Sequence, residues 1–86
     1  MLFLTLMTLM RPEKAGEQRA LLKRLATVTP PPGIKVLGVY LLFGRFNAAI
    51  VFEAPDLKMA ENFTLKIVGL GLYRMETLPA IDAREL

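Results

Sequence analysis

The sequence of 86 residues contains no cysteine, no histidine and no tryptophan. Without cysteine, disulfides, thiolate metal sites and cysteine nucleophiles are excluded. Without histidine, the chain lacks the commonest general acid/base, the commonest metal ligand and the third member of a Ser-His-Asp arrangement. A protein-supplied proximal histidine for haem is excluded as well. Catalysis would depend on carboxylates, lysine, arginine, tyrosine or a bound cofactor, and we expect neither a metal nor a cofactor.

Long apolar runs are also missing. The longest charge-free apolar stretches are Met1 to Met10 and Val36 to Gly44, and both fall well short of the ~20 residues that a membrane-spanning helix needs. The first stretch differs from a signal peptide, because it lacks a positive start and is followed by Arg11-Pro12-Glu13-Lys14 instead of a small-residue cleavage site. We therefore expect a soluble, cytoplasmic protein with no membrane partner.

Apolar residues are in slight excess. They make up 53% of the chain, against roughly 45–50% in ordinary globular domains. On a domain this small, such an excess indicates apolar surface buried against a partner, and we expect a homodimer or a higher homo-oligomer. The net charge of +3 arises in the segment Arg11 to Arg24. We interpret this segment as a solvated helix face, and we expect no nucleic-acid partner.

The pattern of apolar residues and chain breakers predicts six elements in one domain spanning 1–86. These are a strand at Leu2–Leu9, a helix from Glu13 to about Val28, strands at Ile34–Phe43 and Phe46–Glu53, a helix from Pro55 to Gly69, and a strand at Leu72–Leu78. Pro30-Pro31-Pro32-Gly33 separates the first helix from the second strand, Gly44-Arg45 forms a tight turn, and Pro79 onward is a tail. The order βαββαβ is that of the α+β, ferredoxin-like plan. Right-handed crossovers then give one antiparallel sheet, order 4-1-3-2, with both helices on one face.

Two helices cover only one face of such a sheet. On the third strand Ala48, Ile50 and Phe52, with Phe46, alternate with a second set, and the bulkier set suits the helix side. The other face is expected to show Asn47, Ala49, Val51 and Glu53 beside Leu37, Val39 and Leu41 of the second strand. A mostly aliphatic face of this kind is expected to be buried by pairing two sheets about a twofold axis, with a cavity between them.

Three short motifs resemble the GYD-domain family. Gly44-Arg45-Phe46-Asn47 after the second strand is similar to the family's Gly-Arg-Tyr-Asp element, and Glu53-Ala54-Pro55-Asp56 and Arg74-Met75-Glu76-Thr77-Leu78 also match its pattern. The resemblance implies a ferredoxin-like fold paired as a dimeric α+β barrel, with no established activity. Phe46 and Asn47 depart from the family's tyrosine and aspartate, so a phenol and a carboxylate are absent there.

Four residues are candidates for a ligand site. Glu53 ends the inward alternation of the third strand and is a weak candidate for a catalytic carboxylate; its alternative is a solvated strand end or an ion pair. Arg74 and Glu76 share one face of the fourth strand, where charges also serve simply to guard an edge, and Arg74 suits an anion clamp. Asn47 adjoins the hairpin, where asparagine commonly satisfies local backbone groups.

Three functions follow from these expectations. The first is a homo-oligomeric domain that binds a small molecule between paired sheets. The second is a cofactor-free monooxygenase or isomerase of the dimeric α+β barrel type with Glu53 as base. The third is a purely structural oligomerisation module. A deep pocket with a working carboxylate favours the enzyme, a pocket without titratable groups favours the binding domain, and a filled interface favours the module.

Overall fold

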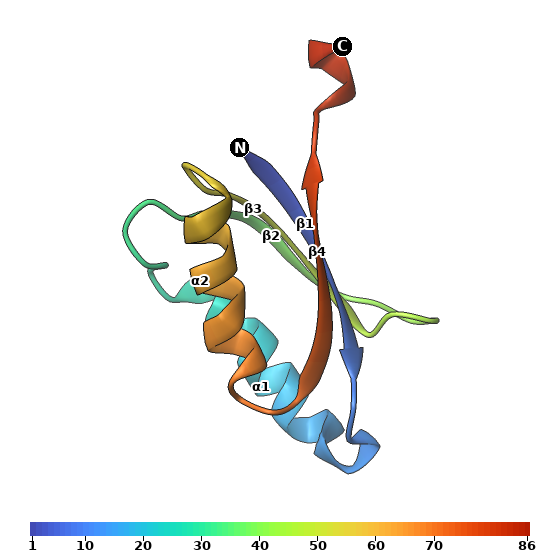
Figure 1. Ribbon diagram of the computed structural model, residues 1–86. Coiled ribbons are helices and arrows are strands. Elements are labelled where there is room, and N and C mark those ends of the chain that lie inside the picture. Colours follow the sequence, from blue (N-terminus) through green and yellow to red (C-terminus); the bar gives the residue numbers. More distant parts are fainter.

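The computed structural model describes residues 1–86 and has the predicted order of main elements (Figure 1). They are β1 (Leu2–Leu9), α1 (Ala15–Thr27), β2 (Lys35–Leu41), β3 (Ala48–Glu53), α2 (Leu57–Val68) and β4 (Tyr73–Ala80). Two 3-10 turns, η1 (Pro12–Lys14) and η2 (Ala83–Glu85), precede α1 and follow β4.

The four strands form one antiparallel sheet with the order β2-β3-β1-β4. This is the predicted order 4-1-3-2 seen from the other edge, with β1 and β3 in the centre. Both helices lie on the same face of the sheet, and the β2–β3 hairpin and the C-terminal tail project beyond it (Figure 1). The predicted ferredoxin-like α+β fold is confirmed.

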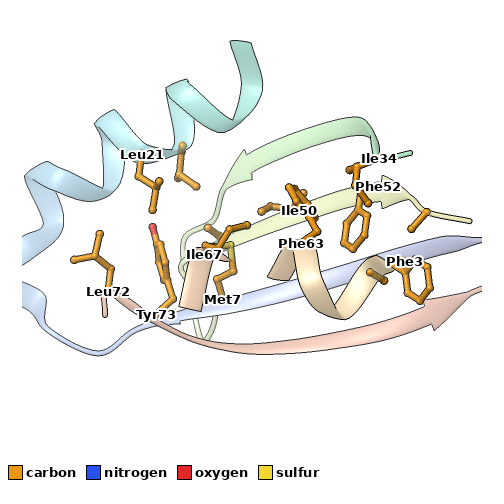
Figure 2. Close-up of a cluster of buried hydrophobic side chains, with 14 residues drawn as sticks. Phe3, Met7, Leu21, Ile34, Ile50, Phe52, Phe63, Ile67, Leu72 and Tyr73 are labelled. Atoms are coloured by element: carbon orange, nitrogen blue, oxygen red, sulfur yellow. The ribbon is translucent and has the colours of Figure 1, made fainter. Parts of the chain in front are cut away.

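The core lies between the helices and one face of the sheet. On β1, Phe3, Thr5 and Met7 are fully buried and alternate with half-buried leucines. The ring of Phe52 stacks on Phe3 at 5.4 Å between centroids and meets the edge of Phe63 at 4.9 Å. These rings come from β1, β3 and α2, so they fix that helix against the central strands (Figure 2).

The helix ends show why the predicted bounds need small corrections. Asp56 is the N-cap of α2, where its Oδ1 accepts a hydrogen bond from the Met59 N–H at 2.8 Å. Pro55 therefore lies outside the helix and not in its first turn, and Leu57, the first residue of the helix, is exposed. In α1, Leu21 and Leu22 are buried, whereas Val28, the predicted end of this helix, follows it and is 60% exposed.

The β2–β3 connection and the end of β4 both differ from the predicted bounds. The β2–β3 connection runs from residue 42 to 47, longer than a tight turn at Gly44-Arg45, and Phe46 lies in this loop beneath the Arg45 guanidinium at 5.4 Å. Gly44 has a φ of +150°, which favours glycine there. Pro79 is not in a tail but pairs with Phe3 within β4. A proline is tolerated there because β4 is an edge strand.

A β-bulge corrects the predicted facing of β2. Val36 pairs with Phe52 and Gly38 pairs with Val51, so Leu37 is an extra residue in the ladder. After the bulge the alternation is reversed. Val39 and Leu41 therefore pack against the core, whereas the uniform alternation predicted that they would share the opposite face with Leu37.

Candidate functional site

The sheet face away from the helices, here called the open face, is built from four rows of paired residues. The rows are Lys35-Glu53-Leu2-Ala80, Gly38-Val51-Leu4-Leu78, Tyr40-Ala49-Leu6-Glu76 and, at the hairpin end, Thr8-Arg74. The middle of this face is aliphatic, and most of its charges lie at its ends and its β4 edge. Leu37, Tyr40 and Leu78 are each about half exposed on it, at 45%, 51% and 45%.

The Tyr40 ring covers the open face at Gly38, the residue that follows the bulge. A side chain at Gly38 would collide with the Tyr40 ring, which lies over the glycine. Glycine at 38 therefore allows the tyrosine to lie flat along the sheet.

A hollow of about 760 Å³ lies where the open face meets the C-terminal tail. We call this cavity the sheet-end hollow. It is lined by Met1, Leu2, Leu37, Glu53, Pro79, Ala80, Ile81, Asp82, Arg84 and Glu85. The volume is within the roughly 300–1,000 Å³ of small-molecule pockets. The Met1 ammonium donates to the Ala54 carbonyl at 2.7 Å, which fixes the start of β1 beside the hollow.

Glu53 is the one predicted site residue that lines this hollow. It ends β3, pairs with Leu2 on one side and Lys35 on the other, and is exposed. It forms no ion pair. Its carboxylate is therefore available to a molecule in the hollow.

Arg74 and Glu76 share one face of β4, and this is the open face, but they lie at the other end of the sheet. Glu76 is opposite Leu6 and Arg74 is opposite Thr8, and both side chains are exposed. Between the Leu2 and Leu6 pairings, β1 rises by about 13 Å. Glu53 and Glu76 are thus farther apart than the roughly 5–10 Å that paired catalytic carboxylates span, and the four candidates do not form one cluster.

Asn47 uses its side chain within the fold. Its Oδ1 accepts a hydrogen bond from the Leu9 N–H at 2.6 Å, and its own N–H donates to the Met7 carbonyl at 2.8 Å. The residue therefore attaches the β2–β3 loop to the end of β1. This is the backbone role that the sequence offered as the alternative to ligand binding.

The tail residues of the hollow were not among the predicted site residues. The Arg84 guanidinium donates to Asp82 at 2.6 Å, and hydrogen bonds from its side chain and its backbone lower the pKa of that carboxyl. The predicted fourth strand ended at Leu78 and Pro79 began a tail, so no residue after Leu78 was expected near the sheet. The signal that it left unused was Asp82 two residues before Arg84, a pattern typical of a local Asx turn.

Two polar atoms on the helix side are buried without a partner. They are the Tyr73 hydroxyl and the Gln18 Oε1. Figure 2 shows the phenol oxygen of Tyr73 pointing toward α1, and burial raises the pKa of this phenol to about 12. Tyr73 is thus a neutral part of the core and does not serve the open face.

No group of three or more acidic side chains is arranged to hold a metal ion. None of the helices combines the length and the apolar character required to cross a membrane.

Comparison with known proteins gives one match. The model of a family described as the GYD domain matches residues 5–86, nearly the whole chain. No curated protein matches.

Proposed function

The chain belongs to the GYD-domain family, and from this premise we propose that it forms a homodimer in which two open faces stack and hold a small molecule between them. The family match covers β2, β3 and β4 completely and β1 from Thr5 onward. The proposal concerns what covers this face and what the sheet-end hollow binds.

The observation that carries the dimer is the amount of exposed surface. A folded monomer of this mass is expected to expose about 5,100 Å², whereas this chain of 9.6 kDa exposes 5880 Å². The excess is close to the ~800 Å² that each partner buries in a standard interface. The radius of gyration of 12.7 Å also exceeds the roughly 12 Å expected for 86 residues.

The open face is the surface best suited to a second copy. Its centre is formed by Leu4, Leu6 and Val51, with Leu78 at the edge. The only charged residue in the two central rows is Glu76, on the edge strand β4. Interfaces are depleted of charge at their centre and polar at their rim. A twofold pairing of this face places apolar residues against apolar residues and leaves the charged ends at the perimeter.

The hollow supports a ligand site within this dimer. It opens at the end of the open face, so a partner sheet stacked there would cover it further. Leu2, Leu37 and Ile81 supply apolar walls, and Glu53 supplies one exposed carboxylate. These groups suit a molecule with an apolar body and one hydrogen-bond donor or cationic group.

The first experiment measures the solution mass by light scattering over a range of concentrations. We expect twice the chain mass of 9.6 kDa for the native protein. Leu78→Glu puts a charge into the proposed interface and should weaken the dimer at least tenfold. Leu65→Glu is the matched control, because Leu65 is similarly exposed (54% against 45%) but lies on α2. A native monomer at every concentration contradicts the dimer.

The second experiment tests the ligand site with a neutral apolar probe, N-phenyl-1-naphthylamine, followed by backbone amide NMR shifts. We expect shifts at Leu2, Glu53 and Ala80, which should be lost in Leu78→Glu together with the dimer. A stable dimer without these shifts would instead support a purely structural module. Equal affinity of the probe for the native protein and for Glu53→Gln would show that the carboxylate does not contribute to binding this probe.

A further inference from the structure

A second concave surface lies on the opposite side of the molecule, between the C-terminal halves of α1 and α2. This helix groove has a volume of about 230 Å³. It is lined by Leu21, Arg24, Leu25, Val28, Thr29, Pro30, Pro31, Val36, Phe63, Lys66, Ile67 and Leu70. It shares no residue with the sheet-end hollow.

The groove is apolar in its floor and at its edges. Leu21, Phe63 and Ile67 are buried and form the floor, whereas Val28 and Leu70 are 60% and 57% exposed. Val28 directly follows α1 and Leu70 is the second residue after α2, where the chain turns back to the sheet. Apolar surface is therefore presented to water around a cavity, and not only scattered singly over the helices.

The charges around the groove all have one sign. Arg24 of α1 and Lys66 of α2 are its only charged lining residues, and no acidic residue lines it. Neither cation forms an ion pair, whereas Arg11 and Lys14 at the other end of the α1 region bind Glu13 and Glu17. A cation in the last turn of each helix also favours the negative end of the helix dipole. That effect accounts for the cations but not for the apolar surface between them.

From this combination we propose that the helix groove binds an amphiphilic carboxylic acid, with its hydrocarbon chain along the floor and its carboxylate between Arg24 and Lys66. The volume sets the size of the chain. A water molecule takes about 30 Å³ in the liquid, so the groove has the room of roughly eight waters, which suits a chain of about six to ten carbons. The carboxylate stays at the rim, where two cations neutralise it.

Amide NMR shifts test the proposal, with octanoate as the titrant below its micelle concentration. We expect saturable shifts at Leu25, Val28 and Leu70. Affinity should rise about fourfold for each methylene added from butanoate to octanoate, because each one buries further apolar surface. Neutral 1-octanol should bind roughly tenfold more weakly, since it makes no contact with the two charges.

Matched variants separate the groove from charge in general. Arg24→Gln with Lys66→Gln should weaken octanoate binding roughly tenfold. Arg19→Gln with Lys23→Gln removes the same charge from exposed α1 positions outside the groove and should leave binding unchanged. Thermal unfolding of both double variants shows that each remains folded.

Three results would overturn the proposal. They are the absence of groove shifts at millimolar octanoate, equal binding of octanol, and shifts confined to the open face. Sedimentation with phosphatidylserine vesicles while octanoate leaves the groove unshifted would favour a lipid surface and also contradict the free acid. The amide shifts identify which residues respond to each ligand. A negative result in the helix groove therefore does not contradict the proposed site at Glu53, and a negative result at Glu53 does not contradict the groove.

Discussion

At the scale of single residues, Asn47 links a family motif to a physical role. Its Oδ1 accepts the hydrogen bond of the Leu9 N–H, and Leu9 is the last residue of β1. An aspartate at this position, which the resemblance to the family implies, would present the same kind of oxygen acceptor. The departure from aspartate to Asn47 therefore preserves the hydrogen bond, so a structural reason suffices for a side chain with an oxygen at this place.

Substitution of Asn47 measures this role. Asn47→Ala leaves the Leu9 N–H without its partner and should lower the free energy of unfolding by about 1–2 kcal/mol. Asn47→Asp keeps the acceptor and should cost less than about 0.5 kcal/mol. Urea unfolding followed by circular dichroism gives both values. Equal losses in the two variants would show that the amide nitrogen, and not Oδ1, is what matters.

At the scale of elements, the bulge at Leu37 decides what β2 contributes to each face. Before it, Val36 faces the core; after it, Val39 and Leu41 do so. The extra residue thus lets three apolar side chains of a short edge strand reach the core and directs Leu37 into the sheet-end hollow. The bulge also interrupts the regular edge, which disfavours further strand pairing there.

Deletion experiments distinguish the extra residue from the paired ones. Removing Leu37 leaves the pairs Val36–Phe52 and Gly38–Val51 as neighbours, so the fold should persist with a loss of at most about 1–2 kcal/mol. Removing Val39 instead takes a side chain out of the core. If Leu37 enters the ladder and restores the register, Gly38, which has no side chain, lies opposite Ile50. We expect that variant to be destabilised by about 3 kcal/mol or more. Thermal unfolding compares the stability of the two deletion variants. Equal losses of stability would contradict the assignment of the bulge to Leu37.

At the scale of the whole molecule, a layer of helices and one sheet leaves one broad face uncovered. Only 18 of the 86 residues are buried, although apolar residues make up about half the chain. The core of 14 buried residues lies wholly on the helix side. The apolar rows on the open face can be buried only by something outside the chain, which is the physical basis of the proposed dimer.

A dimer of this kind makes thermal stability depend on concentration. Dissociation accompanies unfolding, so mass action raises the melting temperature with protein concentration. For two chains of 86 residues, the rise should be roughly 4 °C for each tenfold increase in concentration. Scanning calorimetry over two decades of concentration tests this. Where light scattering shows Leu78→Glu to be monomeric, its melting temperature should not change with concentration. A flat response of the native protein would argue for a monomer.

Local patterns in the sequence determined the order of the elements and most of the core. The apolar run Leu2–Leu9, the helical spacing of Ala60, Phe63 and Ile67, and the breakers between them are local signals, and all lead to the observed elements. The strand order followed as well, because right-handed crossovers leave few topologies for six elements. Period-two alternation predicted that Glu53 lies on the open face and that Arg74 and Glu76 share one face of the fourth strand.

Tertiary structure alone decided which of these residues can act together. Alternation assigns a side chain to a face but gives no position along the sheet, and the strand register separates Glu53 from Arg74 and Glu76. The bulge at Leu37 has no distinct local pattern, because it arises where β2 must match β3. The sheet-end hollow and the helix groove each join segments far apart in the chain. Their existence depends on how layers and tails meet in space, which a one-dimensional pattern does not specify.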